Sequence, residues 1–108
     1  MKLTPISKDF SVTGQIAVTD IAEIVKAGFK TLICNRPDNE GWGQTNHDVI
    51  KASAEKAGLA FHYIPVSGQL TMDTVMQMKT AATQATPALG YCLSGSRAAT
   101  LYQYAMQA

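Results

Sequence analysis

The sequence predicts an α/β domain built on a small, mostly parallel sheet flanked by helices. Short apolar runs over residues 30–36, 59–66 and 87–92 have the length and character of buried strands. Helical patterns of ten or more residues separate successive runs. Because connections of that length are crossovers, we expect neighbouring strands to run parallel, with right-handed crossovers.

The composition indicates a single globular domain over residues 1–108. The chain is 46% hydrophobic and 16% charged, which is enough apolar content for one core. Its net charge of +1 provides no broad basic surface, so neither nucleic acid nor an anionic membrane is expected as a partner. No apolar run has the length of a signal peptide or a bilayer span, and we expect a cytoplasmic protein.

The cysteines and histidines predict neither a disulfide framework nor a metal site. The two cysteines are far apart in the sequence, and the two histidines lack the close spacing of a metal-binding pair. We therefore expect no metal and no cofactor.

The first half of the chain is expected to supply two strands and one helix. Residues 10–16 alternate as an edge strand does, because polar residues interrupt the apolar ones. A helix follows from Thr19 and ends at Gly28, the usual type of stop residue. The run 30–36 is typical of a strand buried on both faces, and Pro37 ends it.

The loop after Pro37 is a candidate rim of a ligand site. Strand ends in an open parallel sheet line the ligand crevice, so Asn35, Arg36, Asp38 and Trp42 are placed where they can overhang it. The plainer interpretation, which we favour, is that Trp42 caps the core and Arg36 pairs with a surface carboxylate.

The second half begins with a helix capped by Thr45, with His47 solvated in its first turn. The strand over 59–66 carries His62, which we expect to be a hydrogen-bonded structural residue. Thr71 then caps a third helix, whose methionines fill the core.

The candidate site lies in the turn between the last strand and the last helix. The first peptide N–H groups of a helix have no intrahelical partner and lie at the positive end of its dipole, so they can bind a tetrahedral oxyanion. Arg97 adds a fork of charged donors, and the same field favours a thiolate nucleophile at Cys92. The predicted catalytic residues are Cys92 and Arg97, and the predicted anion-binding residues are Leu93, Ser94, Gly95, Ser96 and Arg36.

These residues carry a family resemblance. The pattern Cys-x-x-Gly-x-Arg over residues 92–97 resembles the signature loop of cysteine-dependent protein phosphatases and is similar to the active loop of rhodanese sulfurtransferases. With the segments 28–38 and 63–66, it resembles the small bacterial dual-specificity-phosphatase-like domain, found alone or fused to β-lactamase-like hydrolases. The resemblance covers nearly the whole chain and implies the phosphatase fold, with Cys92 as nucleophile and Arg97 as oxyanion ligand.

The sequence departs from the phosphatase pattern in four respects. The loop has four residues between cysteine and arginine instead of the usual five. Tyr91 replaces the common histidine, and Ala98 stands where a hydroxyl is frequent. The general-acid aspartate expected after residues 64–66 is missing, since Asp73 belongs to the next helix.

These departures leave several functions open. A phosphatase-like hydrolase acting on a phosphoester is favoured by the strand pattern and by the segment 64–66. A sulfurtransferase that carries a persulfide on Cys92 is the alternative, because a smaller ring of amides suits a single sulfur atom. A non-catalytic phosphate- or sulfate-binding module and a scaffold that uses neither Cys92 nor Arg97 are further possibilities. The expected ligand is a small anion, either a phosphoester or a sulfur donor, and the sequence discloses no oligomeric state.

Cys34 has two interpretations. If its strand lies beside that of Cys92, the two thiols can approach disulfide distance, and Cys34 would then be a resolving cysteine. A buried structural thiol is the interpretation that we favour.

Overall fold

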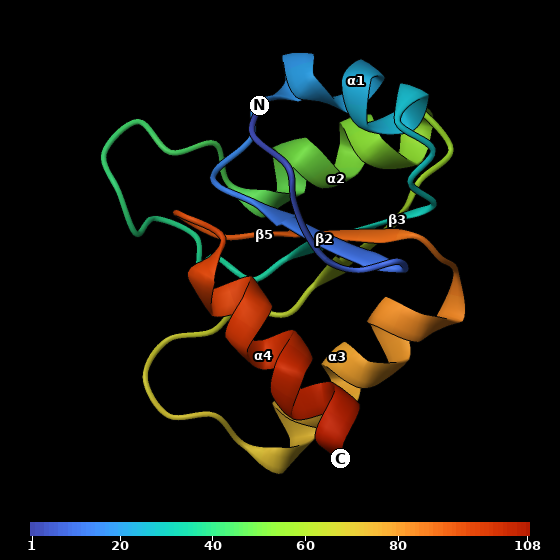
Figure 1. The fold of residues 1–108 in the computed structure, drawn as a ribbon. Coiled ribbons are helices and arrows are strands. Elements are labelled where there is room, and N and C mark those ends of the chain that lie inside the picture. Colours follow the sequence, from blue (N-terminus) through green and yellow to red (C-terminus); the bar gives the residue numbers. More distant parts are fainter.

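A computed structural model describes all of residues 1–108 and confirms the predicted α/β architecture (Figure 1). One five-stranded sheet has the order β1-β2-β5-β3-β4 and lies between two layers of helices. The strands are β1 (Thr4–Ser7), β2 (Phe10–Thr13), β3 (Thr31–Cys34), β4 (Ala60–Tyr63) and β5 (Ala88–Tyr91). The helices are the 3-10 turn η1 (Val18–Asp20), α1 (Ile21–Lys26), α2 (His47–Lys56), α3 (Met72–Gln84) and α4 (Ser96–Gln107).

The sheet is mostly parallel, as predicted, but its edge differs from the prediction. β2 pairs with β5 in parallel, and β5 pairs with β3 and β3 with β4 in the same sense. β1 pairs antiparallel with β2 and forms the outer edge, so the expectation of an edge strand at residues 10–16 was wrong. The four residues of β1 contain Pro5, which edge strands tolerate but which hides a strand from pattern analysis.

Two hydrophobic cores lie on opposite faces of the sheet. Helices α3 and α4 cover the face that presents Ile33 and Cys92, whereas α1 and α2 cover the face that presents Leu32, Cys34 and Tyr91. The central strands β3 and β5 are fully buried, as expected for strands covered on both sides. No helix combines the length and apolar character needed to cross a bilayer.

The helix ends follow the predicted signals with small shifts. The Thr71 hydroxyl accepts a hydrogen bond from the Thr74 N–H at 3.2 Å, so Thr71 caps α3 as expected. α2 begins after Asn46, one residue later than predicted, and the Asp38 carboxylate binds the free N–H of His47 at 2.8 Å. A carboxylate nine residues earlier, in the loop that leads into α2, therefore caps this helix, and the usual spacing of capping residues does not reveal it.

Close packing of α4 on β5 places the start of α4 over the end of that strand. A Cβ atom added to Gly90 would lie 2.8 Å from Phe10 Cζ and 3.2 Å from the Ala98 Cβ. Glycine at this position therefore permits the short helix-to-sheet distance. The packing fixes the geometry of the turn between β5 and α4.

We expect Gly90→Val to destabilise the fold by about 1–3 kcal/mol, because the added atoms overfill a close-packed layer. Urea unfolding followed by circular dichroism measures the change. The matched control is Ala60→Val on the exposed start of β4, where the same side chain should cost less than about 0.5 kcal/mol. Equal stability of the two variants would contradict the packing argument.

Candidate active site

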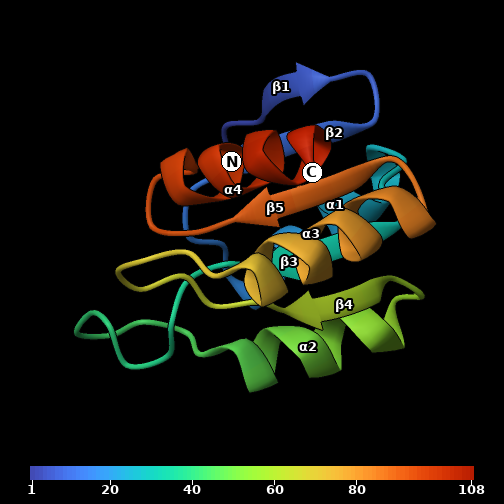
Figure 2. The ribbon, with the colours of Figure 1, turned by 90° about the horizontal axis from the view of Figure 1, so that it is seen from below.

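The predicted site lies at the carboxyl ends of the central parallel strands. Figure 2 shows the loops that follow β3, β4 and β5 at the same end of the sheet. These loops cover residues 35–46, 64–71 and 92–95. This is the edge where parallel sheets place ligand sites.

The loop after β5 folds around the Cys92 sulfur. Cys92 is completely buried, and its Sγ accepts a hydrogen bond from the Gly95 N–H at 3.0 Å. Gly95 has a φ of 96°, in the left-handed region that favours glycine, and this conformation turns the chain into α4. The peptide N–H groups of Leu93 and Ser94 donate to no acceptor in the protein. The loop therefore has donors free for an anion beside the sulfur.

The end of β2 and the residues that follow it hydrogen-bond to the loop after β5. The Gln15 N–H donates to the Leu93 carbonyl at 3.2 Å, and the Cys92 N–H donates to the Thr13 carbonyl at 3.4 Å. A Cβ at Gly14 would lie 2.8 Å from the same Leu93 oxygen. This support was not predictable from local sequence, because it depends on the pairing of β2 with β5.

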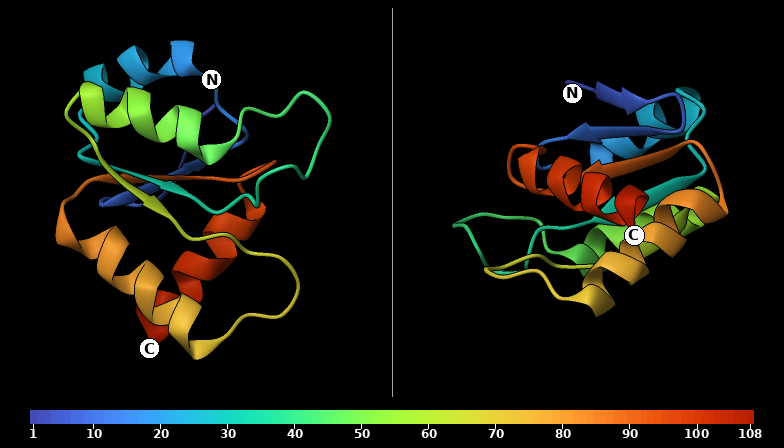
Figure 3. Two further views of the ribbon diagram at one scale, coloured as in Figure 1. Left: turned by 180° about the vertical axis from the view of Figure 1, so that it is seen from behind. Right: turned by 60° about the horizontal axis from the view of Figure 1, so that its bottom comes forward.

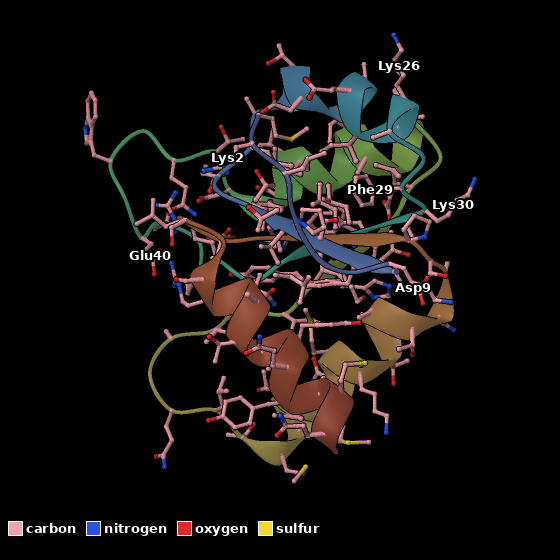
Figure 4. All side chains as sticks on the ribbon, in the orientation of Figure 1. Lys2, Asp9, Lys26, Phe29, Lys30 and Glu40 are labelled. Carbon is pink, nitrogen blue, oxygen red and sulfur yellow. The ribbon has the colours of Figure 1, made fainter.

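Arg97 is held by a carboxylate that the sequence analysis did not single out. Its two terminal nitrogens each lie 2.7 Å from an oxygen of Glu40, and Nη1 also donates to the Val66 carbonyl at 3.0 Å. Figure 4 shows Glu40 beside the first turn of α4, on the loop 35–46, which projects from the rest of the molecule and is called the projecting loop below. Glu40, and more weakly the Cys92 sulfur, raise the pKa of Arg97. The guanidinium is therefore fixed in orientation at the mouth of the Cys92 loop.

Arg36 reaches this site only through Glu40. Its Nε donates to Glu40 Oε1 at 3.0 Å, and its Nη1 donates to Gln15 Oε1 at 3.0 Å. The Arg36 side chain is only 7% exposed. It thus pairs with a carboxylate, as favoured from the sequence, but from a buried position. Its proposed contact with an anion would have to be indirect.

Two arginines lower the pKa of Glu40 from 4.5 to about 2, mainly through the hydrogen bonds from Arg97. Because the folded-state pKa is depressed, the stability that this carboxylate contributes is present above pH 4.5 and is lost as the pH falls towards 2. We expect a carbon-13 NMR titration to place the Glu40 midpoint near 2, with Glu40→Gln identifying the signal. A midpoint near 4.5 would contradict the pairing.

Every other carboxylate near these loops is engaged elsewhere. Asp38 Oδ2 lies 2.6 Å from His47 Nδ1, and the His47 ring stacks on Tyr63 with centroids 3.6 Å apart. The expectation of a solvated His47 was therefore wrong. Asp73 accepts from Gln77 at 2.8 Å on α3. Asp38, Asp73 and Glu40 are thus each bound to another side chain.

Two further expectations about aromatic and histidine side chains need correction. Trp42 is 104% exposed, so it does not cap the core. His62 is half-buried and lines a separate pocket between β4 and α3, and its ring makes no hydrogen bond. Burial lowers the pKa of His62. Neither outcome follows from local sequence, since the first depends on how a loop packs and the second on how an edge strand packs.

Cys34 lies on the strand next to that of Cys92, but on the opposite face. In the β3–β5 register Cys34 is paired with Tyr91, and these two residues share one core while Cys92 belongs to the other. Both thiols are free, and Cys34 Sγ donates to the Arg36 carbonyl at 3.3 Å. Burial raises the pKa of Cys34. These contacts favour a structural thiol over a resolving cysteine.

Sequence comparison places the chain in a known family. Residues 2–108 match the family model described as the beta-lactamase hydrolase-like protein, phosphatase-like domain. The beta-lactamase hydrolase-like protein of Agrobacterium fabrum is 34% identical over 105 residues, and that of Xylella fastidiosa strain Temecula1 is 32% identical over 104. Each match covers 94% of this chain but only 24% of the relative, so the chain spans about a quarter of those proteins.

Solved structures show the same architecture. A crystal structure of a candidate phosphatase from Neisseria meningitidis has a TM-score of 0.84 and 32% identity, covering 94% of this chain and 74% of that one. The catalytic core of Siw14 has a TM-score of 0.69 at 9% identity, covering 92% of this chain and 61% of that one, and shares the fold alone. Given the family match over nearly every residue, the chain belongs to the phosphatase-like domain family of the beta-lactamase hydrolase-like proteins.

Proposed function

We propose that the domain is a cysteine-dependent, phosphatase-like hydrolase with Cys92 as nucleophile and Arg97 as the residue that binds the phosphoryl oxygens. The observation that carries the proposal is the hydrogen bond of 3.0 Å from the Gly95 N–H to Cys92 Sγ. A peptide N–H that points at sulfur stabilises a thiolate over a thiol. The free N–H groups of Leu93 and Ser94 are the matching donors for the oxygens of a bound phosphoryl group.

The reaction would take two displacements at phosphorus. The thiolate attacks phosphorus, the new S–P bond forms, and the P–O bond to the leaving group breaks with its electron pair on oxygen. That oxygen takes a proton from water, which leaves hydroxide. A second water then attacks phosphorus, the S–P bond breaks with its electron pair on sulfur, and the proton that this water releases combines with the hydroxide. Inorganic phosphate leaves and the thiolate is restored. Arg97 and the loop amides hold the charge of the equatorial oxygens in both steps.

The engaged carboxylates predict a dependence on the leaving group. A general acid typically contributes 10²- to 10⁴-fold to such a step, and here Glu40, Asp38 and Asp73 are bound to other side chains. We expect phenyl phosphate to be hydrolysed at least about 100-fold faster than ethyl phosphate, because a phenolate leaves without protonation far more readily than an ethoxide. Phosphate release measures both rates. Comparable rates would indicate an acid that the contacts above do not reveal.

A sulfurtransferase is the second candidate, and the same lack of a free acid favours it. In that reaction the Cys92 thiolate attacks the outer sulfur of thiosulfate, an S–S bond forms and sulfite leaves with the electron pair of the broken bond. Cyanide then takes the sulfur as thiocyanate and restores the thiolate. No proton donor is required in either step.

Two assays on one preparation distinguish these functions. Phosphate release from phenyl phosphate would support the hydrolase, and thiocyanate formation from thiosulfate and cyanide would support the sulfurtransferase. Iodoacetamide alkylation of Cys92 at pH 7, slowed by phosphate but with neither turnover, would support the non-catalytic anion-binding module. Alkylation that phosphate does not affect would overturn an anion site at this loop.

A further inference from the structure

A groove whose lining is uncharged except for Arg97 extends from the anion site along α4. It is called the uncharged groove below. A pocket of about 350 Å³ lies beside Arg97, between the loop 64–71 and α4, and Figure 1 and the left view of Figure 3 show that loop running alongside the helix. Its lining includes Val66, Leu70, Ser96, Arg97, Thr100 and Tyr104. Because Ser96 and Arg97 also belong to the candidate site, the pocket adjoins it.

The groove continues towards the start of α3. A second hollow of about 390 Å³ shares Leu70 and Tyr104 with the first and adds Met72 and Val75. Tyr104 and Met72 are 55% and 69% exposed, so apolar surface remains accessible along this path. An apolar surface adjoining an anion site indicates a ligand with both a charged head and an apolar body.

The charged side chains that line the groove limit how much charge the body of the ligand can carry. Arg97 is the one charged side chain that lines either hollow, and the proposed anion site already uses its charge for the head of the ligand. No lysine, and no carboxylate, lines the groove. A body that carries additional phosphates would therefore find no counter-charge and would lose hydration, whereas an uncharged apolar body would gain contacts.

We propose that this groove selects substrates in which a single anionic head is attached to an uncharged, apolar body, with Leu70 and Tyr104 as the residues that determine specificity. The inference rests on the proposed anion site at Cys92 and Arg97. The head occupies the loop after β5, and the body lies against Leu70 and Tyr104 between the loop 64–71 and α4.

A pair of phosphonates with the same head tests the groove separately from catalysis. We expect naphthalen-2-ylmethylphosphonate to bind at least about tenfold more tightly than methylphosphonate by isothermal titration calorimetry. Leu70→Asp and Tyr104→Ser should each remove most of this gain. Methylphosphonate binding should stay unchanged in Tyr104→Ser and weaken in Leu70→Asp, whose carboxylate repels the anionic head. Val49→Asp, an equally polar change on the exposed face of α2, is the matched control and should keep the gain.

The outcomes separate the groove from the site. Equal binding of the two phosphonates would refute the role of the groove in specificity, but it would not contradict the anion site. A gain that persists in both Leu70→Asp and Tyr104→Ser also refutes the role of the groove. Because Tyr104→Ser alters an exposed side chain, this variant can be used alone if Leu70→Asp fails to fold. Tighter binding of inositol hexakisphosphate than of the naphthyl compound contradicts the charge argument. Failure of both phosphonates to bind or to slow Cys92 alkylation overturns the anion site itself and the groove with it.

Discussion

Cys92→Ser is expected to lower kcat for phenyl phosphate by at least about 10³-fold. A serine hydroxyl in the same position stays protonated, so the hydrogen bond from Gly95 at 3.0 Å would stabilise no anion and the nucleophile would be lost. The fold should be retained, because the hydroxyl can still accept that bond. Steady-state kinetics on both proteins measure the effect.

The matched control is Cys34→Ser, which replaces the other buried cysteine on the opposite face of the sheet. We expect it to keep turnover within a few-fold, provided that it folds as judged by circular dichroism. Phosphate binding should survive in Cys92→Ser, since the loop amides and Arg97 remain. Wild-type turnover in Cys92→Ser, or an equal loss in both variants, would refute Cys92 as the nucleophile.

Arg97→Lys is expected to lower kcat/KM by about 10²- to 10³-fold. A lysine ammonium retains the charge but cannot make the paired contacts through which Arg97 engages Glu40 at 2.7 Å on both nitrogens. The cation would therefore lose its fixed orientation towards the phosphoryl oxygens. Kinetics with phenyl phosphate, together with phosphate protection of Cys92 from iodoacetamide, report the change.

Glu40→Gln separates the direct role of Arg97 from its positioning. The amide keeps the shape of the side chain but removes the charge that holds the guanidinium, so we expect a smaller loss than in Arg97→Lys. If Glu40→Gln abolished activity while Arg97→Lys left it unchanged, the carboxylate rather than the guanidinium would be the functional group at this site.

The parts of the site that are close in sequence were predictable. The loop from Cys92 to Arg97 lies within six residues, and the glycine with positive φ is the residue type that such a turn requires. Covalent connection alone brings these groups together. The apolar runs likewise predicted β3, β4 and β5 and their parallel direction, because crossover geometry permits few alternatives.

The contacts between distant segments were not predictable in the same way. Glu40 meets Arg97 across 57 residues of sequence, and Asp38 meets His47 only because the projecting loop between them returns to the start of α2. Local spacing carries no information about either contact. The same holds for Trp42, whose exposure depends on where that loop ends.

The sequence by itself determined the fold class, the loop proposed to carry the nucleophile and the residues proposed to bind an anion, since each follows from local periodicity or from a short motif. Only the tertiary structure decided that Glu40 orients Arg97, that Cys34 and Cys92 lie on opposite faces, and that an uncharged groove adjoins the site. The physical reason is that strand register and loop packing set these distances, and they arise from the balance of many weak contacts across the whole domain.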